Sequence, residues 1–371
     1  MKKERVAALD IVRSLAIFFV ITLHSVSLTG VLSGNINSIG WTVNLYIRHL
    51  TFCCVPLFII LSGYLQCKKK LSLSYYKGII PIAVSYIIIS ILSLIAKAVY
   101  DKTIVLTPTY IIANILDFTA NDYAWYFEMY IGLFLLIPFL NAMYNALSSR
   151  AGKLTLISTL SFLTLLPLTV KSFSPAYAPG GSFVLDIIPD FFTSLYPITY
   201  YFIGAYFAEY RPFHNPKQPK RAARLAAALL APAIPALLCY AFSHIRGEYA
   251  WYMMNGFNTL TAALTAVAVF TFLYDFEPSA RQVKAVFKFI SECTFEIYLF
   301  SFIFDSFYYA YFACHQAVMI LLVFISSLAA AFITRLILIK PLSALLVRLY
   351  SRLLQKLDSK RSNFVQTESA K

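Results

Sequence analysis

The chain has 371 residues, of which 60% are hydrophobic and 13% are charged. A soluble protein of this size cannot bury so much apolar surface, so the composition excludes a soluble enzyme and indicates an all-α, polytopic membrane protein. The 31 Lys and Arg residues outnumber 17 Asp and Glu residues and give a net charge of +14. In a membrane protein the orientation of the chain explains this excess, and we expect no nucleic acid partner.

The first apolar segment, residues 10–30, follows a basic start. Such a start is typical of a secretory signal peptide. However, this apolar run is about twenty residues long, lacks an A-x-A cleavage site and is followed by further spans. We therefore interpret it as an uncleaved first membrane span.

This first segment carries Asp10, Arg13 and His24. Ionisable groups inside a span are costly and usually face a protein interior or a wet cavity. Arg13 and His24 are eleven residues apart, which on a helix places them within roughly 20° of one face and about 16 Å apart along the axis. One face therefore presents a guanidinium near one membrane surface and an imidazole deeper inside.

Ten apolar segments are predicted to cross the membrane. They comprise roughly residues 10–30, 44–66, 75–99, 124–147, 154–171, 191–209, 225–243, 253–275, 286–307 and 317–340. An even number of spans places both termini on one side.

The Lys and Arg residues indicate which side. With the N-terminus in the cytoplasm, the cytoplasmic loops and tails hold most of these cations, and the outer side holds only Arg48, Lys97, Lys102, Lys171 and Arg246. This bias predicts cytoplasmic termini. Arg13 then lies near the cytoplasmic surface and His24 in the outer half. The outer loop 172–190 is rich in Pro, Gly and Ser, so we expect it to be irregular and to border a substrate entrance.

The C-terminal region forms a second part of the chain. Residues 1–340 hold the spans, whereas 341–371 hold leucines at helical spacing with Arg348, Arg352 and Lys356 between them. This pattern predicts a basic amphipathic helix on the inner leaflet, in contact with membrane lipids, followed by a disordered polar tail.

The six cysteines form no C-x-x-C pair and have no His at metal-ligand spacing. We therefore expect neither a disulfide framework nor a metal site.

The shared face of Arg13 and His24 suggests chemistry, although a helix–helix hydrogen bond is the simpler role for a single intramembrane His. A guanidinium near the inner surface can hold phosphate, and a deeper imidazole can activate a hydroxyl as general base. A donor with a phosphorylated head in the cytoplasm and a reactive end in the membrane suits this arrangement. Acyl-coenzyme A has that shape.

Four motifs carry a resemblance to a known family. They are Asp10, Arg13 and His24 in the first span; Pro56-Leu57-Phe58 with Ser62-Gly63-Tyr64-Leu65 in the second; Trp125-Tyr126-Phe127 with Leu133 to Pro138 in the fourth; and Glu292, Thr294, Tyr298 and Leu299 in the ninth. The motifs occur in the order that is typical of the acyltransferase-3 family of integral membrane acyltransferases, and the chain resembles that family. Within that family it is most similar to the subgroup that O-acetylates surface polysaccharides.

The resemblance implies an O-acetyltransferase of the bacterial cytoplasmic (inner) membrane. It would move an acyl group, by default acetyl from acetyl-CoA, to a sugar hydroxyl of a lipid-linked or surface glycan, in the company of the polysaccharide biosynthesis machinery. His24 would be the catalytic base and Arg13 would steady the donor. Asp10 either orients Arg13 through an ion pair or caps the helix.

Two positions depart from the family pattern. Many members carry two arginines near the start of the third span, where Lys77 is the only nearby cation here, and Lys binds phosphate without the bidentate fork of Arg. The ninth span commonly ends with a His, which is Ser301 in this chain.

Three more residues have both a functional and a structural interpretation. Glu292 and Glu296 are four apart and so share a helical face. They can orient His24 or line a cavity, or form interfacial ion pairs with nearby cations. Trp125 is either an interfacial aromatic anchor or a platform for a sugar, with Tyr298 as a second substrate contact.

Two other functions remain open. Ten spans with intramembrane charges also suit a transporter or glycan flippase, although the chain has only 12 Gly and shows no internal repeat. A non-catalytic subunit of an export complex is the third interpretation.

Overall fold

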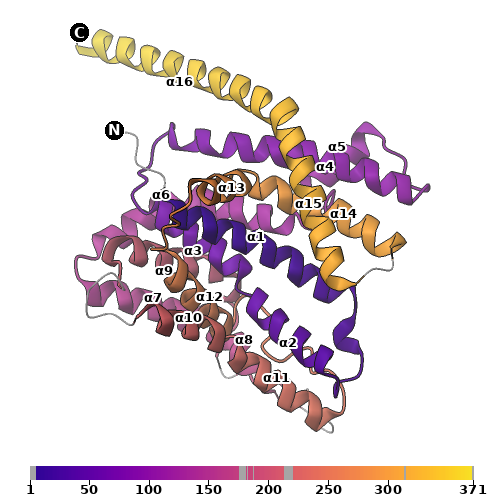
Figure 1. Ribbon diagram of the computed structural model, residues 1–371. Helices are drawn as coiled ribbons and strands as arrows, with labels where there is room; N and C mark the ends of the chain where they lie inside the picture. Colours follow the sequence, from indigo (N-terminus) through magenta and orange to yellow (C-terminus); the bar gives the residue numbers. More distant parts are fainter. Residues whose placement is uncertain are drawn as a thin grey trace. The chain divides into compact units, whose positions relative to one another are not determined.

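The computed structural model describes residues 6–174, 181, 183–186, 188–212, 220–312 and 315–369, with side chains described to residue 356. All regular structure in these residues is helical, which confirms the predicted all-α class (Figure 1). Among the described residues, six helical stretches are long and apolar enough to cross a membrane: Ala7–Leu28, Ile39–Gln66, Tyr75–Tyr100, Trp125–Ala146, Arg221–Arg246 and Gln316–Lys356. The chain is therefore a multi-pass membrane protein.

The other four predicted spans fall on shorter or more polar helices. They correspond to α7 (Arg150–Thr164) with α8 (Leu166–Lys171), α9 (Tyr196–Tyr210), α12 (Leu260–Leu273), and α14 (Thr294–Tyr311). Helices α9 and α12 have 15 and 14 residues, fewer than the roughly 20 that cross a bilayer without help from neighbours. Ten spans and cytoplasmic termini remain predictions.

The predicted ninth span is not one helix. An amphipathic helix, α13 (Arg281–Glu292), ends at Cys293, and α14 starts at Thr294. Cys293 has φ −103° and ψ 5°, which lies outside the α region and breaks the helical repeat. The expectation that Glu292 and Glu296 share a helical face is therefore wrong, because the two residues lie on different helices.

The second predicted span is also interrupted. It consists of α2 (Ile39–Thr51) and α3 (Cys54–Gln66), with a turn at Phe52 and Cys53. Pro56 explains the turn, because it has no N–H to donate to the carbonyl of Phe52 four residues earlier.

The chain forms two compact units. The first contains Met1–Lys68, Met143–Thr294 and Asp305–Ile325. Within it, α1 (Ala7–Leu28) packs against α2, α3, α12 and α13, and α10 (Arg221–Leu230) and α11 (Ala233–Arg246) pack on α12 and α2 respectively. Val12, Ile17 and Ile21 of α1 are fully buried, so α1 lies in the centre of this unit.

Helices α3 and α9 approach each other unusually closely in the first unit. A Cβ atom on Gly63 would lie 2.0 Å from the carbonyl oxygen of Tyr201, and one on Gly204 would lie 1.9 Å from that of Ile60. Both positions therefore require glycine.

The second unit contains Lys69–Ala142, Phe295–Phe304 and Ser326–Lys371. Its helices are α4 (Ile80–Tyr100), α5 (Pro108–Leu116), most of α6 (Trp125–Ala146) and the C-terminal half of α15 (Gln316–Thr334). A π-helical segment, Arg335–Ile339, joins α15 to α16 (Lys340–Ser369), so the three form one continuous stretch (Figure 1). The backbone of α16 stays helical through the stretch for which we expected a disordered tail.

Candidate functional site

The site in the first unit is built on α1, which is unbroken from Ala7 to Leu28. Arg13 and His24 thus keep the helical spacing that the sequence predicts. Their partners lie on helices that are consecutive in the chain, α13 for Arg13 and α14 for His24.

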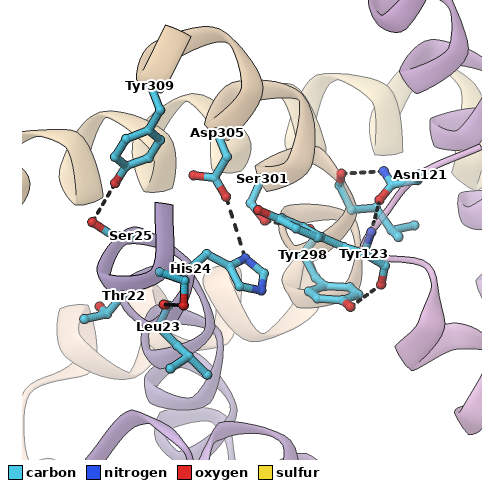
Figure 2. A network of polar contacts seen from close by, with 12 residues as sticks. Thr22, Leu23, His24, Ser25, Asn121, Tyr123, Tyr298, Ser301, Asp305 and Tyr309 are labelled. Carbon is cyan, nitrogen blue, oxygen red and sulfur yellow. Dashed lines mark hydrogen bonds and ion pairs between the residues drawn. The ribbon is translucent and has the colours of Figure 1, made fainter. Parts of the chain in front are cut away.

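Near the end of α1 that we predict to lie on the outer side of the membrane, His24 faces Asp305 of α14 (Figure 2). His24 Nδ1 lies 3.6 Å from Asp305 Oδ2, and the two side chains are 21% and 3% exposed. The carboxylate is almost fully removed from solvent, so its charge acts on the imidazole with little screening. This is the arrangement in which a carboxylate orients a histidine and fixes which nitrogen carries the proton.

A second contact joins the same two helices. Tyr309 Oη donates a 2.6 Å hydrogen bond to Ser25 Oγ. Ser25 follows His24, and Tyr309 lies one helical turn after Asp305, so both contacts hold one face of α14 against α1 (Figure 2).

At the other end of α1, a serine links the predicted acidic and basic residues. Ser291 Oγ donates to Asp10 Oδ1 at 2.7 Å and accepts from Arg13 Nη1 at 3.1 Å. Asp10 is 6% exposed. Ser14 donates to the carbonyl oxygen of Phe287 at 3.2 Å and strengthens the contact with α13. Asp10, Arg13 and Ser291 form a buried polar cluster that fixes the guanidinium.

The alternative role of Asp10 as helix cap is wrong. The N-cap residue of α1 is Val6, and Asp10 lies within the first turn of the helix. Glu292 is the last residue of α13, half-buried and directly after Ser291. The structure therefore brings two of the four predicted catalytic residues, Asp10 and Arg13, to the contact between α1 and α13, places Glu292 at the end of α13, and brings His24 to α14.

The predicted sugar-contacting residues lie in the second unit. The ring of Trp125, the first residue of α6, meets that of Tyr126 edge to face at a centroid distance of 6.1 Å. Tyr126 meets Tyr298 in the same way at 5.8 Å. The two predicted residues thus belong to one aromatic row, in which Tyr126 is the connecting ring.

Hydrogen bonds hold the Tyr298 end of this aromatic row in place (Figure 2). Tyr298 Oη donates to the carbonyl oxygen of Tyr123. Asn121 Nδ2 donates to Ser93 Oγ and to the carbonyl oxygen of Leu299, each at 2.9 Å. Trp125 is 37% exposed.

Two cations of the second unit differ in their surroundings. Lys77 is half-buried in the short helical segment Tyr75–Ile79. Arg335 starts the π-helical segment, and its Nη1 donates to Glu296 Oε1 at 2.8 Å, an oxygen that also accepts from Ser85 at 2.9 Å. Glu296 is thus engaged in an ion pair of its own unit.

Sequence reasoning missed Asp305 and Ser291, and it named Tyr126 only as a member of the fourth-span motif. A signal existed only for Asp305, an acidic residue inside an apolar segment. Within the described ranges, no group of three or more His, Cys, Asp and Glu residues is placed to hold a metal ion.

Comparison with known proteins matches the chain to a protein family. The acyltransferase-3 family model, described as an acyltransferase domain, matches residues 6–336. No curated protein and no solved structure matched the chain.

Proposed function

Because this chain belongs to the acyltransferase-3 family and is a membrane acyltransferase, we propose that it transfers an acyl group, by default acetyl, from cytoplasmic acyl-CoA to a sugar hydroxyl of a lipid-linked or surface polysaccharide. The observation that carries this proposal is the pair of His24 and buried Asp305, 3.6 Å apart.

His24 is the general base in this proposal. With Nδ1–H directed at Asp305, the other ring nitrogen, Nε2, is left to accept a proton. A sugar hydroxyl gives its proton to Nε2 while its oxygen attacks the thioester carbonyl carbon. The C–S bond then breaks, and the coenzyme A thiolate takes up the proton. Asp305 stabilises the imidazolium between these two steps. The separation of 3.6 Å is longer than a hydrogen bond, and such contacts tighten when substrates bind.

Arg13 holds the donor. Its guanidinium is fixed by Ser291 near the end of α1 that we place in the cytoplasm, where the phosphates of acyl-CoA arrive. A planar guanidinium is suited to bidentate phosphate contacts. Asp10 and Glu292 position it, and Lys77 adds a further point charge for the donor.

Trp125 and Tyr298 contact the acceptor. Sugars present apolar C–H faces that pack on aromatic rings, and the row through Tyr126 offers a surface of this kind. The partners are the glycan and the polysaccharide biosynthesis machinery, and the location is the bacterial inner membrane. The acyltransferase domain spans residues 1–340 in ten crossings, and 341–371 lie in the cytoplasm.

Mass spectrometry of the surface glycan tests the proposal. Cells that carry His24→Ala should make the protein in normal amount and lose the acyl mass on the sugar. His315→Ala is the matched control, because His315 is exposed at the start of α15 and should leave the acyl mass in place. A normal acyl mass with His24→Ala would refute the role of His24. Loss of the whole polymer in a deletion strain, without an acyl change, would favour glycan export instead.

A further inference from the structure

A cavity of about 470 Å³ lies in the first unit between two loops. One loop follows α1 and contributes Ser33, Asn35 and Asn37. The other side is formed by the end of α11, which contributes His244, and by the loop after it, which contributes Glu248 and Tyr249. Small-molecule sites typically measure roughly 300–1,000 Å³, so this cavity has room for a sugar residue.

The walls of the cavity are held by a buried tryptophan. Trp41 is 2% exposed, and its Nε1 donates to the carbonyl oxygen of Leu32 at 2.9 Å. Its ring meets those of His244 and Tyr249, each at a centroid distance of 6.2 Å. The loop after α1 and the loop after α11 thus share one core. The lining is arranged before any ligand binds, which lowers the entropic cost of binding.

The lining offers both donors and acceptors. His244 Nδ1 lies 2.9 Å from the carbonyl oxygen of Tyr240. A carbonyl only accepts, so Nδ1 carries the proton and Nε2 of the neutral ring is an acceptor. Asn35 Oδ1 accepts from the backbone N–H of Asn37 at 2.9 Å, so the Asn35 amide NH₂ remains a donor. Glu248 adds carboxylate acceptors. Sugar hydroxyls donate and accept, and need such a mixed set.

The charge of Glu248 disfavours anionic ligands. Its carboxylate lines the cavity and accepts a hydrogen bond at 2.5 Å from Arg246, whose guanidinium also lies over the ring of Tyr252 at 5.5 Å. A phosphate or sulfate would face this carboxylate and compete with it for Arg246, which costs free energy. A neutral ligand rich in hydroxyl groups meets no such penalty.

We infer that this cavity is a binding subsite for a neutral sugar residue of the acceptor glycan, remote from the sugar that is acylated. The link to acylation rests on the proposed function. In the proposed orientation the cavity opens on the outer side, where α1 ends a few residues after His24. A glycan held by Asn35, His244 and Glu248 is thereby anchored on the helix that carries the base.

Equilibrium binding tests the subsite directly. The probe is a set of neutral oligosaccharides released by mild acid from the surface polysaccharide of the cells that make the protein. They are titrated calorimetrically into the purified full-length chain in detergent. The Asn35→Ala/Asn37→Ala double variant should raise Kd at least tenfold, and Glu248→Gln about fivefold. These three residues are exposed, so their substitution spares the fold.

Asn44→Ala is the matched control. Asn44 donates to the carbonyl oxygen of Gly40 within its own helix, at 2.9 Å, and does not line the cavity. Its Kd should equal that of the unaltered chain. Equal Kd values in all variants, or no binding by the unaltered chain, would overturn the subsite.

An acyl-transfer assay separates this inference from the proposed function. If the cavity variants raise KM for the acceptor and leave KM for the donor unchanged, the subsite is supported. If the unaltered chain binds the oligosaccharides at the cavity but transfers no acyl group to them, the proposed function fails and the subsite stands. If transfer depends on His24 but acceptor KM is the same in the cavity variants, the subsite fails and the proposed function stands.

Discussion

Asp305 holds its carboxylate 3.6 Å from the imidazole of His24, and it does so on a helix that is fastened one turn later by the hydrogen bond from Tyr309 to Ser25. The hydrogen bond from Tyr309 to Ser25 matters because the packing of α14 against α1 determines the distance between His24 and Asp305. A buried carboxylate at this distance attracts the ring and is close enough to form a hydrogen bond with it when the substrate binds.

Asp305→Asn should lower kcat by about a hundredfold, within the range that general acid–base catalysis contributes. The amide keeps the shape of the side chain but removes the charge that stabilises the imidazolium. KM for acyl-CoA should stay the same, because in the proposed function the donor is held at the other end of α1. Steady-state kinetics of the purified protein measure both constants.

Tyr309→Phe serves as the comparison for that experiment. It removes one hydrogen bond between the helices, worth about 1 kcal/mol, and leaves the carboxylate charge in place, so the fall in kcat should stay below about tenfold. If both variants lose folded protein and activity in equal proportion, Asp305 is a packing residue and the catalytic interpretation is wrong.

Ser291→Ala should raise KM for acyl-CoA about tenfold with little change in kcat. Its hydroxyl connects Asp10 to Arg13, and without it the guanidinium loses its 3.1 Å hydrogen bond to Ser291. Ser62→Ala, whose hydroxyl bonds the carbonyl of Phe58 in its own helix, is the control and should leave KM unchanged. An unchanged KM in Ser291→Ala would show that donor binding does not depend on this cluster.

The sequence was sufficient to predict the geometry of the first helix, but it was insufficient to predict which residues contact Arg13 and His24. The spacing of Arg13 and His24 depends only on the geometry of one helix, and α1 is continuous, so that prediction could be made locally. Ser291 and Asp305 are 278 and 281 residues away from Arg13 and His24 respectively. Nothing in the local pattern of either segment encodes such a pairing, which only the packing of α13 and α14 on α1 reveals.

The error at Glu292 and Glu296 has a different origin. Helical periodicity places residues four apart on one face only when a single helix contains both. The break at Cys293 separates them. Glu296 then pairs with Arg335, for which the sequence analysis proposed no partner. Hydrophobicity alone does not report a one-residue break between an amphipathic helix and an apolar one.

Gly63 is a motif residue for which the need for glycine becomes clear only from the three-dimensional structure. Gly63→Ala should destabilise the protein by about 3 kcal/mol, at the upper end of what overpacking usually costs, because the new methyl group would meet the backbone of α9 at Tyr201. The helices must then separate. The thermal midpoint in detergent measures the effect.

Gly132→Ala is the matched control for that substitution. Gly132 also lies within a helix, but a Cβ atom there has no neighbour within 4 Å, so alanine should be neutral or stabilise by up to about 1 kcal/mol. Equal midpoints for both variants would show that α3 and α9 can separate without cost.

The contact that joins the two ends of loop 172–190 is predicted to loosen in acid. Lys171 donates a hydrogen bond to Asp190 and lies 3.6 Å from Asp186, so one ammonium group joins the two ends of this loop. That hydrogen bond, together with the lysine charge, lowers the pKa of Asp190. A carboxyl whose pKa is lower in the folded protein stabilises the fold above its ordinary pKa of about 4 and loses that contribution as the pH falls through the folded value.

A spin label on Phe183→Cys, an exposed position of the loop, should therefore stay restrained from pH 7 to pH 5 and become mobile below about pH 4. With Asp190→Asn the label should be mobile at every pH, and a label that stays restrained in that variant would show that other contacts hold the loop.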